Sequence, residues 1–260
     1  MLRITAFALV TSTLFVFSAY AEKFEPGCPY PWGDIASPAP LDKTCGRTGD
    51  APGAAHQAQN RAKTNVCASG TPTLLKHEDF VELQDRVTSI PHGKGVVPKD
   101  RKPLATIYSR DGDTIGEGTL VRYVGYVLEA RKARSTESVN CKESDVADTD
   151  IHIDLVASPS VRNPCNSITA EMIPHGRPKM WTRPNINKID RPVRVTGQLM
   201  FDAMHDLCKN GKPTPGNPAR ISLWEIHPVY ALDVCRSTSL QACSAGDETV
   251  WTPFHKWLEE

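Results

Sequence analysis

The stretch "RISLWEIHPVYALDVC" (residues 220–235) decides the fold of this chain. Its apolar residues stand at alternate positions, which is the pattern of a strand with one face in a core. Glu225 and His227 lie two positions apart at its centre and therefore share the other face. Pro228 has no N–H to donate to a neighbouring strand, so it indicates an edge, a bulge or the end of regular pairing.

Four segments upstream predict further strands. The first is too long for a flat strand, and Gly125 at its middle would let it coil and serve two sides of a small barrel. Two of the others alternate apolar and polar residues, and one is shorter. The four segments are residues 117–133, 149–157, 167–173 and 193–205. An irregular or partly helical connection separates the third from the fourth.

Five strands in this order, with a long first strand kinked at glycine, follow the element order of an OB-fold. The predicted fold class is mainly β: a five-stranded OB-like barrel preceded by a small helical, disulfide-pinned N-terminal segment. Another small barrel and a β-sandwich are the alternative architectures. Helices are predicted over residues 54–68 and 73–87, and residues 89–103 form a linker rich in helix breakers.

The predicted organisation has four parts. Residues 1–21 are a signal peptide, and residues 22–103 are a cysteine-containing extended arm with a helical segment. Residues 104–240 are the OB-like β-barrel domain, and residues 241–260 are a C-terminal tail.

The N-terminus has the features of a secretory signal. Arg3 precedes an apolar run, and Ala19 and Ala21 place small residues at the positions that a signal peptidase requires. Cleavage near Ala21 predicts a secreted or periplasmic protein, with no membrane span after cleavage because no later segment approaches about 20 apolar residues. The 30 Lys and Arg residues balance the 30 Asp and Glu residues, which excludes a strong overall field towards nucleic acid or anionic lipid.

Eight cysteines follow the predicted cleavage site. An even number in an exported chain predicts disulfides, and the absence of any C-x-x-C pair argues against a structural zinc site. The spacing leaves the connectivity open: pairing within the first three cysteines plus one later partner is one alternative, and Cys141 with Cys165 is another. The disulfide candidates are Cys28, Cys45, Cys67, Cys141, Cys165, Cys208, Cys235 and Cys243.

The chain resembles a family of exported, uncharacterised bacterial proteins with a WEIHPVY-type strand and an OB-like body. The resemblance covers most of the chain after the signal and is most specific at "WEIHPVY" (224–230) and "ESVNC" (137–141). Further segments that carry it are "QNRAKTNVCA", "EGTLVRYVGYVLEAR", "DIHIDL", "ITAEMIPH" and "VRVTGQLMFDAMH". It implies the fold and the export, and it supplies no catalytic residues.

The stretch "DGDT" (111–114) before an arginine-bearing strand is similar to a segment of staphylococcal-nuclease-like domains. That resemblance would assign calcium to Asp113 and phosphate to Arg122. The Asp-x-Pro-Glu segment of such nucleases is missing here, and the spacing from Asp113 to Arg122 is short for them. Asp-Gly-Asp is also a common turn, which is the interpretation we favour.

Histidines and carboxylates recur near the ends of several predicted strands. The candidate binding residues are His152, Glu171, His205, Glu225 and His227. If they converge, His152, His205, Glu225 and His227 would offer imidazole nitrogens and a carboxylate to a divalent metal. A plainer interpretation places them on the solvent face of half-buried strands, where each cross-strand pair contributes about 0.2–1 kcal/mol.

Other kinds of site have weaker signals. An OB-like barrel could bind nucleic acid through Tyr123 and Tyr126 with Arg122 and Arg131, but the same tyrosines could line the core. The serine-nucleophile motif G-x-S-x-G and the glycine-rich nucleotide loops are absent from the sequence.

Two functional hypotheses follow. The first is an exported OB-like module that binds an unidentified small ligand or protein partner. The second is a metal-dependent hydrolase, a phosphodiesterase or nuclease, that uses the histidine and carboxylate pairs. A divalent metal is a cofactor only under the second hypothesis, and convergence of the candidate side chains within about 5 Å of one point would favour it.

Overall fold

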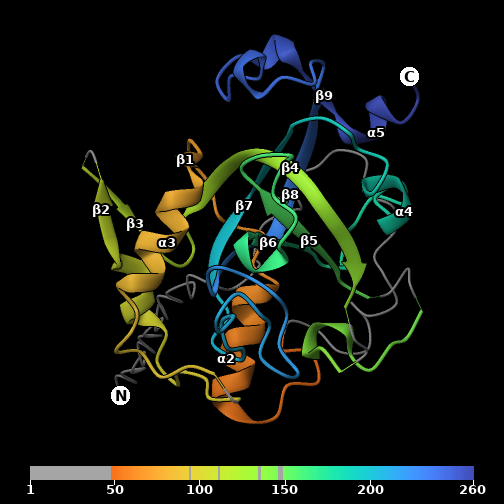
Figure 1. Ribbon diagram of the computed structural model, residues 1–260. Helices are drawn as coiled ribbons and strands as arrows, with labels where there is room; N and C mark the ends of the chain where they lie inside the picture. Colours follow the sequence, from red (N-terminus) through yellow and green to blue (C-terminus); the bar gives the residue numbers. More distant parts are fainter. Residues whose placement is uncertain (1–47, 94, 111, 134–135, 146–148) are drawn as a thin grey trace, which may run out of the picture.

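The computed structural model of the protein (Figure 1) describes residues 48–93, 95–110, 112–133, 136–145 and 149–260. The predicted signal peptide and the arm up to residue 47 lie outside these residues. The strands are β1 (Thr73–Leu75), β2 (Tyr108–Arg110), β3 (Asp113–Ile115), β4 (Leu120–Lys132), β5 (Ile151–Val156), β6 (Ile168–Met172), β7 (Val193–Phe201), β8 (Trp224–Cys235) and β9 (Trp251–Pro253). The α-helices are α2 (Gly53–Lys63), α3 (His77–Asp85), α4 (Arg183–Ile186) and α5 (Phe254–Trp257). The 3-10 turns are η1 (Lys102–Thr106), η2 (Ser138–Asn140), η3 (Pro164–Asn166), η4 (Leu240–Ala242) and η5 (Glu248–Val250).

Five of the strands form a closed barrel. Their order is β4-β5-β6-β8-β7, and β7 pairs back onto β4. The pair β6–β8 is parallel, whereas the other four pairs of the barrel are antiparallel. The prediction of a mainly β chain with a closed five-stranded barrel is therefore confirmed.

The long strand β4 takes part on both sides of the closure, as its sequence predicts. Residues 120–125 pair with β7, and residues 126–132 pair with β5. Gly125 stands at the changeover, where an added Cβ would lie 2.6 Å from the carbonyl oxygen of Val156. Only a residue without a side chain allows the strands to approach so closely there.

Strand β8 is interrupted at Pro228, as expected, and the interruption is a bulge. The pairing between β7 and β8 shifts register on both sides of Gly197, whose Cβ position is blocked by the Pro228 carbonyl. The strand is not at an edge, because β8 also pairs with β6 and β9. The bulge changes the local twist of the strand just after Glu225 and His227.

The apolar residues of the barrel strands meet inside the barrel, and the core continues into helix α3. Trp224 is fully buried, and its indole Nε1 donates to the carbonyl of Leu83 on α3 over 3.0 Å. Phe80 of the same helix packs edge-on against Tyr123. The helix predicted from residue 73 begins only at His77, because residues 73–75 pair with β4 as strand β1. Figure 1 shows α3 beside the barrel and α2 below it.

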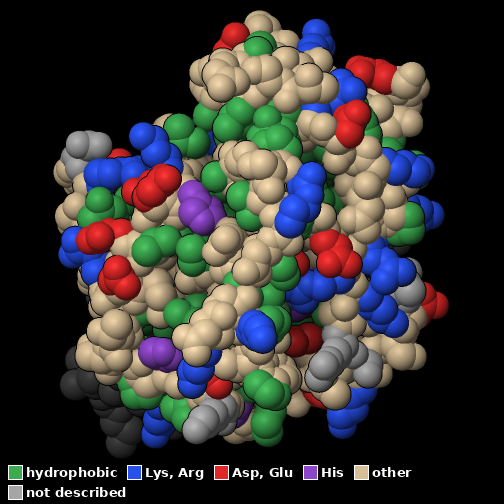
Figure 2. All heavy atoms as spheres, viewed as in Figure 1, with side chains coloured by type: hydrophobic (Ala, Val, Ile, Leu, Met, Phe, Trp, Pro, Cys, Tyr) green, Lys and Arg blue, Asp and Glu red, His purple; other side chains and the backbone are tan. Residues whose placement is uncertain are grey.

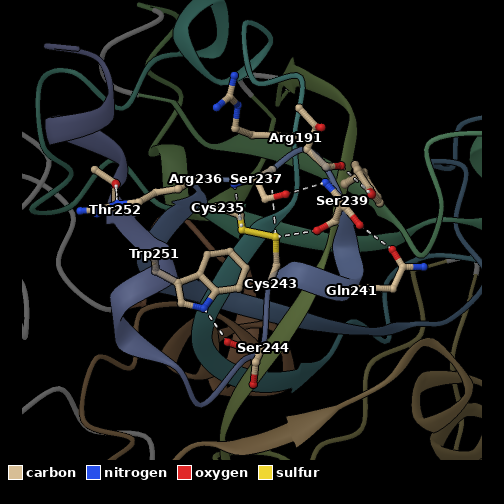
Figure 3. Close-up of a disulfide and its surroundings, with 12 residues drawn as sticks. Arg191, Cys235, Arg236, Ser237, Ser239, Gln241, Cys243, Ser244, Trp251 and Thr252 are labelled. Atoms are coloured by element: carbon tan, nitrogen blue, oxygen red, sulfur yellow. Dashed lines mark hydrogen bonds between the residues drawn. A yellow bond between two sulfur atoms is a disulfide. The ribbon is translucent and has the colours of Figure 1, made fainter.

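Disulfides hold the later loops of the chain. Cys165 is bonded to Cys208, so the alternative pairing of Cys141 with Cys165 is wrong. The bond between Cys235 and Cys243 ties the end of β8 to the C-terminal loop (Figure 3). The indole of Trp251, the first residue of β9, donates to the carbonyl of Ser244 in that loop over 2.8 Å. Cys67 and Cys141 are also disulfide-bonded.

Among the helices of the described residues, none is long and apolar enough to cross a membrane.

Candidate functional site

A buried cluster of charged side chains lies against the outer face of the barrel wall. Glu171 on β6 and Glu225 and His227 on β8 alternate with core residues such as Ala170 and Ile226, so they point away from the core. Each of the three is at most 1 % exposed. The solvent-facing interpretation of Glu225 and His227 is therefore wrong, because other parts of the chain cover this face of the wall.

Helix α2 and the residues after it provide much of that cover. Gln59 donates to Asp202 over 3.1 Å, and the buried Lys63 ammonium lies 3.2 Å from Glu137. Asn65 donates to Gln198 on β7. Hydrogen bonds and ion pairs of this kind let α2 cover charged residues rather than an apolar surface.

His227 is the centre of the cluster. Its Nδ1 lies 3.0 Å from a carboxylate oxygen of Glu225 and 3.0 Å from one of Glu171. Ionised carboxylates only accept hydrogen bonds, so Nδ1 carries a proton. Burial alone would lower the pKa of His227, but the two carboxylates raise it to about 10. Its second nitrogen, Nε2, is buried without a hydrogen-bond partner among the described residues.

His152 on β5 has a different role from His227. The Arg131 guanidinium lies 3.3 Å from its Nδ1, and a guanidinium can only donate. Nδ1 is thus the acceptor, and the ring proton stands on Nε2, which lies 3.3 Å from Glu171. Burial lowers the pKa of His152 to about 4, in keeping with a neutral ring. His152 therefore faces Arg131 with Nδ1 and Glu171 with Nε2, and it does not belong to the group of three possible metal ligands.

Asp150, directly before β5, completes a group of three possible metal ligands. Asp150, Glu171 and His227 each offer one ligand atom, and these atoms lie within 4.8 Å of one another. Asp150 is fully buried, and neither of its carboxylate oxygens has a hydrogen-bond partner within the described part of the chain. Burial raises the pKa of Asp150 to about 7, despite the opposing effect of His227.

A second group of charges adjoins this trio and is held by Arg220. The fully buried Arg220 guanidinium lies 2.9 Å from Glu225 and 3.1 Å from Asp202. Asp202 in turn lies 2.5 Å from Nδ1 of His205. Arg220 therefore connects the carboxylate behind His227 to the ion pair at the end of β7.

The ion pair between His205 and Asp202 predicts a pH-dependent stability. Asp202 raises the pKa of His205 above its ordinary value, although burial opposes the shift. The contribution of His205 to stability is therefore complete below about pH 6.5, the unperturbed value, and is lost as pH rises through the folded-state pKa. We expect His205→Asn to lower the free energy of unfolding by about 1.5–3 kcal/mol at pH 5.5 and by less at pH 9, measured by urea unfolding. An equal loss at both pH values would contradict a charged His205.

The structure brings all five predicted binding residues into one connected network, four of them by direct contacts. Glu171 contacts both His152 and His227, and His227 also contacts Glu225. His205 is connected to Glu225 through Asp202 and Arg220. Of the predicted metal ligands, only His227 belongs to the group of three. Glu225 is paired with His227 and Arg220, His205 with Asp202, and His152 with Arg131.

Sequence reasoning missed Asp150, Lys63 and Arg220. Asp150 lies within the predicted strand segment 149–157, two residues before His152 and on the same face, but it is not among the candidate site residues. Lys63 lies on a helix with no apolar stripe that marks a buried face, and Arg220 precedes the first residue of β8. The alternation that places His152 and Asp154 on the polar face of this segment also includes Asp150, and this signal could have identified it.

The residues of the other predicted sites, for nucleic acid and for calcium with phosphate, do not form open binding surfaces. Tyr123 is 1 % exposed and Tyr126 is 9 % exposed, so neither forms an open platform for nucleic-acid bases. Asp113 lies in the β2–β3 hairpin, whereas Arg122 on β4 contacts Thr196, the Ala245 carbonyl and Glu248.

No family model matches the chain, and searches of curated proteins and of solved structures also found no match. The geometry of the cluster is therefore the basis for a proposed function.

Proposed function

We propose that the chain is an exported OB-like module that binds a divalent cation through Asp150, Glu171 and His227. The barrel order supports the OB-like assignment: numbered along the barrel, the strands follow 1-2-3-5-4 and return to 1, with strands 3 and 5 parallel. The disulfides support export, because such bonds persist in oxidising compartments.

The carboxylate of Asp150, which has no hydrogen-bond partner among the described residues, is the observation that carries the cation proposal. A buried carboxylate without a hydrogen bond costs several kcal/mol, and a cation would remove that cost. The ligand atoms of Glu171 and His227 lie within 4.8 Å of one from Asp150, which places all three around one point. One imidazole and two carboxylates suit Zn²⁺ and other first-row divalent ions.

The surroundings of His227 support the same assignment. In metal sites, a ligating histidine commonly donates its other N–H to a carboxylate, which orients the ring and increases its basicity. Glu225 has that position here, 3.0 Å from Nδ1 of His227, and is itself held by Arg220. With Nδ1 so engaged, Nε2 is the nitrogen available to a cation, which would displace its proton.

The burial of the site favours binding over hydrolysis. Asp150 and His227 are 0 % exposed and Glu171 is 1 % exposed. A phosphodiesterase needs a coordination position that a substrate can reach. The convergence of side chains that the hydrolase hypothesis requires is present, but solvent access is not, and we therefore propose a cation that stabilises the module.

The experiment measures metal content by elemental analysis. We expect the purified mature protein, incubated with Zn²⁺ and dialysed, to retain one equivalent of metal. Asp150→Asn keeps the side-chain shape and breaks no hydrogen bond within the described residues, and we expect it to retain at least tenfold less metal. His205→Asn serves as a matched control, because His205 belongs to the network but lies outside the trio, and it should retain metal as the wild type does.

Three results would count against the proposal. A wild-type protein that retains no metal would contradict it, and so would an Asp150→Asn protein that retains as much as the wild type. Hydrolysis of bis-p-nitrophenyl phosphate that depends on Asp150 would replace binding with the hydrolase hypothesis. Circular dichroism of each variant distinguishes loss of binding from loss of fold.

A further inference from the structure

Lys63, the last residue of α2, carries a positive charge into the buried cluster. The residue is 3 % exposed, and its ammonium lies 3.2 Å from Glu137. By contrast, Figure 2 shows Lys and Arg side chains at the surface of one face of the molecule, some of them next to Asp or Glu. Water and salt screen such surface charges, but they screen a buried charge much less. Lys63 therefore acts on buried groups more strongly than an exposed lysine does.

The backbone before Lys63 is tied to the strand that carries His227. Nε2 of Gln198 on β7 donates to the carbonyl of Ala62 over 2.8 Å and to the carbonyl of His227 over 2.9 Å. One side-chain amide therefore joins the end of α2 to the backbone of a proposed cation ligand. Gln198 is buried, so a shift of α2 would leave buried polar groups without partners, and the position of Lys63 is fixed.

The ammonium of Lys63 contacts the segment that holds Asp150 in place. Its partner Glu137 precedes the turn η2, and the Glu137 carbonyl accepts the N–H of Asn140 in that turn over 3.0 Å. The side-chain oxygen of Asn140 in turn accepts the N–H of Asp150 over 2.8 Å. Lys63 is thus linked at its backbone to the strand of one proposed ligand, His227, and at its side chain to the support of another, Asp150.

The charge of Lys63 also acts on the proposed ligands themselves. Burial would lower the pKa of Lys63, but Glu137, Glu171 and further carboxylates raise it well above its ordinary value, so the side chain is charged. Burial raises the pKa of Asp150, and the Lys63 charge is among the charges that oppose this. Burial would also raise the pKa of Glu171, and Lys63 is among the groups that lower it instead. Two of the three proposed ligands therefore lie within electrostatic reach of the ammonium.

We propose that the positive charge of Lys63 limits how tightly the site proposed above binds its divalent cation. The ammonium stabilises the ionised carboxylates in the absence of the cation, and it repels the cation in the bound state. Both effects weaken binding, which makes the bound cation exchangeable. An ammonium has no lone pair, so Lys63 controls the site without being a ligand. This inference rests on the proposed cation site and assigns a residue that sets its affinity.

The experiment measures the dissociation constant of Zn²⁺ for the mature protein by competition with a chromophoric chelator at pH 7. Lys63→Met keeps a side chain of similar length without the charge, and we expect it to bind Zn²⁺ roughly tenfold or more tightly than the wild type. A merely structural role of Lys63 predicts the opposite sign, which is weaker binding. Lys63→Arg keeps the charge and should bind Zn²⁺ within roughly threefold of the wild type. Lys188→Met removes an exposed lysine outside the cluster and should leave the affinity unchanged.

Lys63→Met leaves the Glu137 carboxylate without its partner, so a second pair of variants guards against a loss of fold. Glu137→Gln and the double variant Lys63→Met with Glu137→Gln differ only at Lys63. The double variant leaves neither charge of this pair behind, and it should bind Zn²⁺ roughly tenfold more tightly than Glu137→Gln alone. Circular dichroism of each variant checks the fold.

The outcomes separate this inference from the cation site itself. If Lys63→Met binds Zn²⁺ as tightly as the wild type or more weakly, and Asp150→Asn abolishes binding, the inference about Lys63 is wrong and the cation site stands. If neither the wild type nor Lys63→Met binds Zn²⁺, both proposals fail. If only Lys63→Met binds, and does so through Asp150, the Lys63 charge excludes the cation from the wild type, which supports its role and overturns the proposed function.

Discussion

Replacement of Arg220 by methionine is expected to lower the free energy of unfolding by about 3–5 kcal/mol. Arg220 is 0 % exposed and pairs with two buried carboxylates, those of Asp202 and Glu225. Methionine fills a similar volume but leaves both carboxylates without their cation in a region that water does not reach. The loss is measured by urea unfolding at neutral pH, where both carboxylates of the wild type are paired.

Two further variants make the Arg220 result specific. Arg191→Met removes an arginine from an exposed pair with Asp190 and should change stability by less than about 0.5 kcal/mol. The double variant Arg220→Met with Glu225→Gln removes one of the uncompensated charges and should recover part of the loss. If Arg220→Met alone loses less than about 1 kcal/mol, the network of buried charges is not what holds this face of the barrel together.

Substitution of Asp150 by asparagine is expected to change stability in opposite directions with and without a cation. In EDTA, the variant should be as stable as the wild type or more stable, since it removes a buried carboxylate that has no partner within the described residues. With Zn²⁺ at about 100 times the dissociation constant, the wild type should gain about 2.7 kcal/mol. The variant should gain much less, because it lacks one of three ligands.

The comparison is made by urea unfolding of both proteins in EDTA and in Zn²⁺. The disulfides matter for its interpretation, because bonded cysteines cannot bind Zn²⁺ in the unfolded chain and so cannot offset the effect. Glu129→Gln, on β4 outside the cluster, is the matched control and should gain as much from Zn²⁺ as the wild type. An equal gain in wild type and Asp150→Asn would show that the cation binds elsewhere.

The charged cluster joins elements that are far apart in the sequence. Lys63 on α2 meets Glu137, and Gln59 meets Asp202 after β7. Such contacts fix α2 in one position on the barrel wall. If the helix shifted, the polar groups that lost their partners would be left buried and unpaired. The site and the docking of the helix are therefore one structural feature.

The barrel itself could be predicted because its determinants are local. Alternation of apolar residues identifies the strands, Gly125 marks the place where a side chain would block the changeover of β4, and Pro228 marks the bulge in β8. The sequence pattern does not separate strand β1 from the start of α3, because residues 73–75 become a strand only by pairing with β4. A three-residue strand has no periodicity of its own.

The amino-acid sequence by itself determined the strand faces, the alternation that puts His152 opposite the core and His227 beside Glu225, and the cysteines that tie the loops. Only the tertiary structure decided that the polar face of the wall is buried and that Arg131 makes His152 an acceptor. It also decided that Asp150 lies near Glu171 and His227 without a hydrogen-bond partner in the described part of the chain. The physical reason is that burial and charge pairing depend on which distant segment covers a strand. The alternation of apolar and polar residues identifies the two faces of a strand, but it does not identify which other segment of the chain covers each face.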